Sequence, residues 1–335
     1  MTEQNIDQRP PMPLEFYEPS LLAGVGLIVY GIALFLIPAI LCRLIWTSFD
    51  SLTLRICLIL PLTIISGFGL QVFGIVGHEG IHMSLCRNKL LGLLIGLFLT
   101  SSILTYVEMG LAIRHWDHHR FTNQPSDPDI QLVSNLKTWW QRLLFTRIVA
   151  NSTYIGITLN HALGGPWPCV YKLPLKSSTI RSLCWINFAF SAFWLAIYIG
   201  ISLYDPLTGI FSILLPMIAS AFVNTFQTYV DHAGTISDEL FHNAWSRTSP
   251  FMTAIYCGLN YHLEHHLYPG IPCYRLHKVH KLLKESGIYA EVKATVEPGF
   301  LNSYFKINAE YEPVKKDSSF DPFLAPTKSF SAITN

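Results

Sequence analysis

The chain has 335 residues, of which 50% are hydrophobic and 13% are charged, whereas soluble domains carry roughly 25% charged residues. Its net charge of +1 gives no reason to expect a nucleic-acid partner, and its seven cysteines include no CxxC pair, which argues against a disulfide framework or a thiolate zinc site. The mean hydropathy of +0.35 indicates instead that lipid covers much of the surface.

Four apolar runs are long enough to cross a bilayer as helices, which takes roughly 20 residues. None contains a charged residue, and short turns join them in pairs, so they predict two helical hairpins. They occupy residues 21–41, 56–77, 182–204 and 207–230. A polar tail of residues 1–20, without a secretory signal, precedes them. Residues 21–311 are expected to form one catalytic domain, and residues 312–335 a disordered tail.

A fifth apolar run, residues 90–107, is about the length of a short span. Histidine clusters lie on both sides of it, and a single crossing would put them in opposite compartments, so we expect it to be re-entrant or interfacial. Of the 23 Lys and Arg, ten lie between residues 87 and 181 and ten follow residue 230, while the hairpin turns contain none. The positive-inside rule then places both termini and the middle segment in the cytoplasm.

The histidines are concentrated in three short motifs and one single position, all beside or after predicted spans. Residues three or four apart share one face of a helix, so each HxxHH can direct three imidazoles to one region and HxxxH can direct two. Nine nitrogen donors are too many for one ion and suit two. The nine are His78 and His82 in HEGIH, His115, His118 and His119 in HWDHH, His232 in YVDHAG, and His262, His265 and His266 in HLEHH.

The sequence therefore predicts an all-α integral membrane protein with two transmembrane hairpins and a cytoplasmic helical cap that binds metal. Imidazole suits iron, copper, zinc and nickel, so the ligand type alone does not choose the metal. A metal centre at the mouth of an apolar bundle lies beside a long apolar substrate, and oxidation of such a chain is work for a metal. A pair of irons that uses dioxygen is the hypothesis that follows.

Several polar residues near these histidines are candidates for outer partners, because a metal-bound imidazole usually donates its second N–H to a carboxylate or carbonyl. The candidates are Glu79, Asp117, Asp127, Asp129, Asp231 and Glu264. Histidines outside the motifs are expected to be packed or surface residues. These are His161, His242, His277 and His280.

Together the motifs closely resemble the histidine boxes of membrane fatty acid desaturases. The late box reads NYHLEHHLYPGIPCYRL and the second continues as HHRFTNQPSDPD, and the resemblance extends from about residue 77 to residue 280. It implies two non-haem irons held by the nine histidines, O2 as co-substrate, and insertion of a double bond into an acyl chain. A water-holding asparagine occurs in some members, and Asn260 or Asn224 is the candidate here.

The resemblance also has implications for partners. The acyl chain is expected to be linked to a lipid, coenzyme A or an acyl carrier protein. No cytochrome b5 motif is evident, so electrons are expected to come from a separate ferredoxin, or from cytochrome b5 with its reductase. In the first box a glutamate follows the histidine where many family members have aspartate.

Three alternatives remain open from the residues alone. Hydroxylases and ketolases that act on fatty-acyl or carotenoid substrates use similar boxes, although the wording of the last box favours desaturation. HEGIH also satisfies the HExxH motif of intramembrane zinc proteases, but that interpretation leaves seven candidate ligands unexplained. A metal transporter is disfavoured because transport sites tend to lie near the membrane midplane, whereas these histidines lie at span ends.

Overall fold

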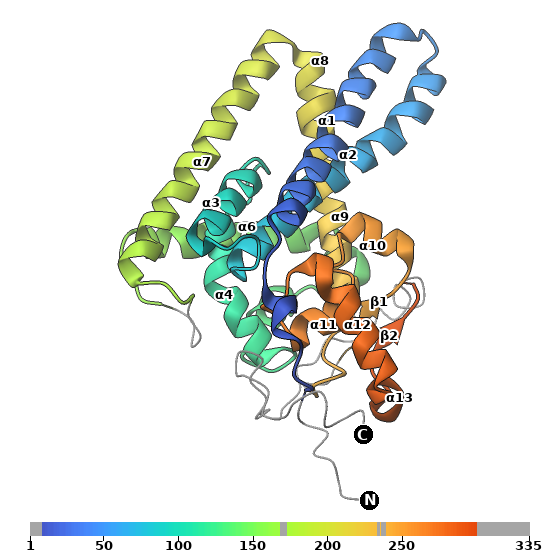
Figure 1. Ribbon diagram of the computed structural model, residues 1–335. Helices are drawn as coiled ribbons and strands as arrows, with labels where there is room; N and C mark the ends of the chain where they lie inside the picture. Colours follow the sequence, from blue (N-terminus) through green and yellow to red (C-terminus); the bar gives the residue numbers. More distant parts are fainter. Residues whose placement is uncertain (1–8, 168–172, 233–234, 236–238, 300–335) are drawn as a thin grey trace, which may run out of the picture.

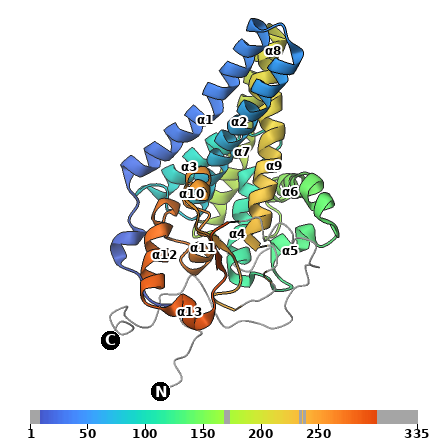
Figure 2. The same ribbon diagram turned by 90° about the vertical axis from the view of Figure 1, so that its right-hand side faces the viewer.

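The computed structural model describes residues 9–167, 173–232, 235 and 239–299. Of the two predicted tails, residues 1–20 therefore lie partly outside the described residues, and residues 312–335 lie wholly outside them. Four helices are long and apolar enough to cross a membrane, and they project from one end of a cap of shorter helices (Figures 1 and 2). They are α1 (Leu21–Ser48), α2 (Leu52–Ile81), α7 (Ser177–Tyr204) and a continuous fourth helix made of α8 (Pro206–Gly209), the π-helical segment η2 (Ile210–Leu214) and α9 (Leu215–His232).

Each long helix extends beyond its predicted apolar run. The 28 residues of α1 are about 42 Å long, which exceeds a hydrocarbon core of roughly 30 Å. Its start is fixed by Ser20, whose hydroxyl accepts from the backbone N–H of Ala23, and Ser51 begins α2 in the same way. The extra turns hold polar residues such as Arg43, which ion-pairs with Asp205 at 3.1 Å and so links the two hairpin tips. Sequence hydropathy detects the apolar part of each helix, and capping determines its actual end.

Small residues set the spacing of the spans. A Cβ atom on Gly69 would lie 2.3 Å from the backbone nitrogen of Phe35, and one on Gly67 would lie 2.7 Å from the Cβ of Ala219. The α2 backbone therefore approaches both α1 and α9 closely, as is common where lipid provides no hydrophobic force between helices. The hydroxyl of Ser66 donates to the Phe35 carbonyl at 2.7 Å. These contacts make α2 the central helix of the spans.

The fifth apolar run forms a short helix and a turn rather than a long helix. Within it, α3 (Lys89–Thr100) has 12 residues and is about 18 Å long, which is shorter than a bilayer core. It packs against α7, where the Trp194 indole donates to the Phe98 carbonyl and the Tyr198 hydroxyl to the Ser102 carbonyl. The chain then turns into α4 (Glu108–Phe121), which brings the first and second histidine motifs to the same end of the bundle.

The cap is built from short helices around a second apolar core. Arg247 is buried in it, paired with Glu297 at 2.7 Å and donating to the Val230 carbonyl at 3.0 Å. The first described residues also reach this core, since Arg9 donates to the Leu267 carbonyl and the Tyr268 hydroxyl to the Pro10 carbonyl. The remaining elements are η1 (Leu14–Tyr17), α5 (Pro128–Val133), α6 (Trp139–Ala162), β1 (Ser246–Arg247), α10 (Pro250–Tyr256), α11 (His262–Leu267), η3 (Cys273–Arg275), α12 (Leu276–Glu285), α13 (Ile288–Val292) and β2 (Val296–Glu297), with β1 and β2 pairing in parallel.

Candidate metal centre

Four helices bring the nine motif histidines together at the junction between the spans and the cap. His78 lies in the last turn of α2 and His82 is its C-cap, so both point from one face. His232 is the last residue of α9. The other two motifs lie on α4 and α11, and all their histidines are buried. Residues far apart in the chain thus meet in one buried region.

Helices α4 and α11 each contribute to two neighbouring groups, because their histidines are three and four residues apart. On α4, His115 and His119 share one face while His118 points to another. On α11, His262 and His266 share a face while His265 points elsewhere. The result is a five-histidine group (His78, His82, His115, His119 and His265) and a four-histidine group (His118, His232, His262 and His266).

In the five-histidine group the Nε2 atoms converge on one another. His115 Nε2 lies 3.0 Å from His78 Nε2, 2.9 Å from His82 Nε2 and 3.1 Å from His119 Nε2. His265 Nε2 lies 3.0 Å from His119 Nε2. All five ligand atoms lie within 4.8 Å of one another, which is compatible with a single shared ion.

In the four-histidine group His262 Nε2 lies 3.0 Å from His232 Nε2 and 3.1 Å from His266 Nε2. The ring of His118 lies 4.9 Å from the ring of His232 and 5.0 Å from that of His266, measured between centroids. The two groups adjoin, because the rings of His119 and His266 are only 4.3 Å apart. Two cations bound here would therefore be neighbours.

The proton count of these rings fits metal binding. A neutral imidazole carries one ring proton, yet His115 Nε2 faces three other ring nitrogens at hydrogen-bond distance. Hydrogen bonds cannot satisfy all four nitrogens, whereas one cation can accept all four lone pairs. Burial, and then the neighbouring histidines, lower the pKa of His115 and of His119 well below its usual value. Both rings are therefore neutral, which is the form that binds a metal.

Comparison with known proteins agrees with this arrangement. The fatty acid desaturase family model matches residues 56–297, from α2 to β2, a range that contains all nine histidines. The chain belongs to the fatty acid desaturase family. The structure thus confirms the predicted fold class of four membrane-spanning helices with a helical cap, and the family match confirms the resemblance and makes the chain an oxidoreductase.

Two curated relatives are about a quarter identical to this chain over the aligned residues. Dihydrorhizobitoxine desaturase of Bradyrhizobium elkanii is 25% identical over 238 residues, which cover 66% of this chain and 66% of that protein. The chloroplastic omega-6 fatty acid desaturase of Glycine max is 24% identical over 253 residues, which cover 68% of this chain and 57% of that protein. The match thus spans just under two-thirds of the first relative and just over half of the second.

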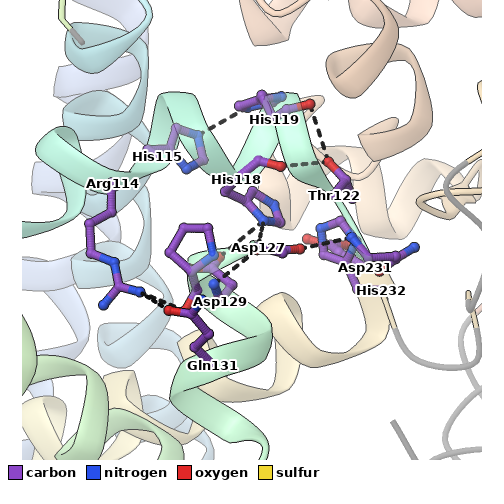
Figure 3. Close-up of polar contacts among 12 residues, drawn as sticks. Arg114, His115, His118, His119, Thr122, Asp127, Asp129, Gln131, Asp231 and His232 are labelled. Carbon is purple, nitrogen blue, oxygen red and sulfur yellow. Dashed lines mark hydrogen bonds and ion pairs between the residues drawn. The ribbon is translucent and has the colours of Figure 1, made fainter. Parts of the chain in front are cut away.

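The outer contacts of the nine motif histidines come from carboxylates, a hydroxyl and a backbone carbonyl. His118 Nδ1 lies 2.9 Å from Asp127 and 3.6 Å from Asp129 (Figure 3). Burial alone lowers the pKa of His118, but these two carboxylates raise it to about 9, so a metal ion that binds its Nε2 atom would have to displace the proton there. Asp127 is well fixed, because it also accepts from the backbone N–H groups of Asn123 and Asp129.

Two further outer contacts were not predicted from the sequence. His232 Nδ1 lies 3.1 Å from the Asn243 carbonyl, and His266 Nδ1 lies 3.2 Å from the Thr122 hydroxyl. A backbone carbonyl leaves no sequence signal. Thr122, however, follows the second motif by three positions, so its place at the end of α4 was a detectable clue. Asp231 lies 3.7 Å from His262 Nδ1, beyond hydrogen-bond distance.

Three of the other candidates, Glu79, Glu264 and Asn260, bond to cap residues. Glu79 accepts from the Ser84 hydroxyl at 2.8 Å and from the Cys273 N–H at 3.2 Å. Glu264 accepts from Tyr289 and His280, and also bonds Ser246. Asn260 donates to the Arg247 carbonyl and the Thr253 hydroxyl, whereas Asn224 donates to Gln71 at 2.7 Å and lines the same cavity as the histidines. Asp117 is buried on α4.

The four histidines outside the motifs lie outside both groups. His161 Nδ1 lies 3.0 Å from the Ile157 carbonyl and its ring packs on Trp167. His242 contacts the Lys293 carbonyl, and His277 is exposed on α12. His280 packs between Tyr261 and Tyr289 and lies against Glu264, so it helps to fix α11.

Proposed function

We propose that this protein is a membrane acyl desaturase that uses dioxygen and two non-haem irons to insert a double bond into an acyl chain. Two adjacent methylene groups each lose one hydrogen, and an external donor supplies two electrons. These, with two protons from water, reduce O2 to two molecules of water. The single observation that carries the proposal is the pair of adjoining all-histidine groups in a chain of the fatty acid desaturase family.

The nine histidines would hold the irons, five in one group and four in the other. Bound there, the metals supply the activation of dioxygen that side chains cannot perform. The chain itself excludes water by burying the rings, and it orients His118 through Asp127 and His266 through Thr122. Imidazole donors alone do not select iron, so metal content is part of the test.

The proposal extends to topology and partners. Residues 21–311 form the catalytic domain, the termini and the metal centre face the cytoplasm, and a separate ferredoxin or cytochrome b5 with its reductase delivers the electrons. The distribution of Lys and Arg supports this orientation. The position of the nine histidines at one end of the spans supports a metal centre close to the membrane surface.

The test is expression in a host with a simple fatty-acid profile, followed by mass spectrometry of total acyl chains and metal analysis of the purified protein. New unsaturated chains and about two irons per protein are expected. The variant His118→Ala should lose the product, while His277→Ala, an exposed histidine outside both groups, should keep it. Hydroxylated chains would move the protein to the hydroxylases, and a single zinc would refute the di-iron centre.

A further inference from the structure

Three chambers that share lining residues lie at or near the histidine groups. A large chamber of about 580 Å³ lies between α6, α9 and the turn before α4. A small chamber of about 100 Å³ lies between α5, α6 and the end of α9. A histidine chamber of about 120 Å³ is lined by His78, His115, His118, His232 and His262.

The histidine chamber stands between the other two. It shares Gly74, Tyr106, Arg147 and Asn224 with the large chamber. It shares His118, Asp129, Arg147, Tyr154, Thr228 and His232 with the small chamber. A substrate that reaches the histidines can therefore extend in two directions, and Arg147 borders all three spaces.

The large chamber suits a hydrocarbon. Its lining is mostly aliphatic and comes in part from the membrane-spanning α9, including Leu214 and Ile218, and in part from α6, including Ile148. These three side chains are 51%, 47% and 64% exposed, so the chamber opens on the surface that faces lipid. A volume of about 580 Å³ is within the range of roughly 300–1,000 Å³ of small-molecule sites. An acyl tail can enter it sideways from the bilayer.

The small chamber is more polar than the large one. Two arginines and one carboxylate, Arg142, Arg147 and Asp129, line it together with Tyr229 and Thr228. Arg142 is held by the Leu136 carbonyl and lies over the Tyr229 ring. Arg147 lies over the Tyr106 ring and interacts electrostatically with Asp129 and Glu108, both beyond ion-pair distance. Among the described residues its buried Nε has no hydrogen-bond partner. A carboxyl-derived oxygen of a ligand would satisfy this group.

We infer that the substrate lies with its carboxyl-derived end beside Arg147 in the small chamber and its methyl end in the large chamber. This rests on the proposed function. The two volumes determine how much of the acyl chain lies on each side of the histidines. A space of about 100 Å³ holds few atoms besides the polar group, so most of the acyl chain must lie in the large chamber of about 580 Å³. The oxidised carbons are then near the carboxyl end, at a position counted from that end.

Gly74 controls the passage from the histidine chamber to the large chamber. It lies one turn before His78 on α2 and lines both spaces. A Cβ atom there would meet only the Asn224 Nδ2 atom, at 3.9 Å, whereas the glycines at 67, 69 and 77 are packed against neighbouring atoms at less than 3 Å. A larger side chain at this position therefore fits the helix but occupies the path of the tail.

The first experiment supplies an expressing host with saturated fatty acids of increasing even chain length and locates each new double bond by mass spectrometry. The expected result is a constant position counted from the carboxyl carbon. A constant position counted from the methyl end would overturn the inference while leaving the desaturase proposal intact. Absence of any oxidised acyl chain, or oxidation of an isoprenoid, would instead contradict the proposed function on which the inference rests.

The second experiment compares Gly74→Leu with Gly200→Leu. Gly200 lies on α7 with nothing within 4 Å of a built Cβ and lines none of the three chambers. Gly74→Leu should reduce conversion of the longest chains by about tenfold or more, the scale of an overpacked site, without moving the bond in shorter ones. Gly200→Leu should convert all chains normally. Equal conversion of long chains by both variants would refute the placement of the acyl tail beside Gly74.

A third comparison tests Arg147 as a positioning residue. Arg147→Met should scatter the bond over several positions and raise KM, and Arg147→Lys should restore a single position because it keeps the cation. Iron content is measured in each variant to show that the centre is intact. A single unchanged bond position in Arg147→Met, with iron bound, would exclude this role.

Discussion

In the five-histidine group the ring nitrogens that point away from the centre have few partners, whereas in the four-histidine group most are bonded. Among the described residues, the Nδ1 atoms of His78, His115 and His265 have no hydrogen-bond partner. The Nδ1 atoms of His118, His232 and His266 contact a carboxylate, a carbonyl and a hydroxyl. The first group is held mainly by its helices, and the second also by its outer contacts.

The chambers make the same distinction. His118 and His232 of the four-histidine group border both the small and the histidine chambers, while the five-histidine group contributes only to the latter. Five donors also occupy more of a metal's coordination positions than four do. The four-histidine group is thus the more accessible from the chambers, and outer contacts fix the orientation of more of its rings.

The largest expected effect tests whether the groups bind separate irons. His82→Ala in the five-histidine group and His266→Ala in the four-histidine group should each abolish activity and reduce the iron content from about two to about one per chain. Activity is read from the acyl products and iron from metal analysis, with His277→Ala as control. Two irons and full activity in either variant would break the division into two groups.

The next effect concerns orientation. Asp127→Asn keeps the size of the side chain but weakens its contact with His118, and we expect activity or metal affinity to fall roughly 10- to 100-fold, as for outer partners of metal ligands. Asp129→Asn is the matched control, because its side chain is 42% exposed and lies farther from the ring, at 3.6 Å. Equal losses in both variants would show that charge, and not the Asp127 hydrogen bond, matters.

A third prediction concerns stability on the side of the five-histidine group. Glu108 is fully buried, both of its carboxyl oxygens lack hydrogen-bond partners among the described residues, and it abuts Gly77 beside the first motif. Burial raises its pKa from about 4.5 to about 8. The folded chain thus keeps a proton that the unfolded chain releases above about 4.5, so stability should fall as pH rises from about 4.5 to about 8.

Glu108→Gln removes this titration and should stabilise the protein at pH 8 by up to about 4 kcal/mol, because each unit of the raised pKa corresponds to about 1.4 kcal/mol. Thermal unfolding in detergent across this pH range measures it. Glu239→Gln, at a side chain that is 74% exposed, should leave the pH profile unchanged. A profile in Glu108→Gln that matches the parent would show that another group titrates.

The smallest effect returns to the four-histidine group. Thr122→Val retains the shape of the side chain but removes the hydroxyl that contacts His266 Nδ1 at 3.2 Å. The free energy of iron binding should weaken by about 1 kcal/mol, which corresponds to a roughly fivefold lower iron affinity. Thr122→Ser, which keeps the hydroxyl, should restore most of it. Iron affinity is compared by competition with a chelator, and a normal value in Thr122→Val would limit the outer contacts to Asp127 and Asn243.

Much of this molecule follows from local sequence patterns. The four apolar runs predict the spans, and the spacing of the histidines predicts which helix faces they share. The division of the histidines into two groups could not be predicted from the sequence, because it depends on how α4 packs relative to α11. Glu264 was expected near a motif histidine, yet it lies against His280, sixteen positions away. Arg147 left no signal at all, since its role depends on three chambers that only the packing of α6 and α9 creates.

The contact between the first described residues and the last histidine motif constrains when the fold can be completed during synthesis. Arg9 and Leu267 are 258 positions apart, and a ribosome that adds roughly 5–20 residues per second needs about 13–50 s to cover that distance. During this interval α11 has not been synthesised, so the N-terminal segment and the histidines of α2 and α4 lack their contacts with it. The set of nine histidines is therefore completed only near the end of synthesis, and premature termination before α11 leaves an open, incomplete set of ligands.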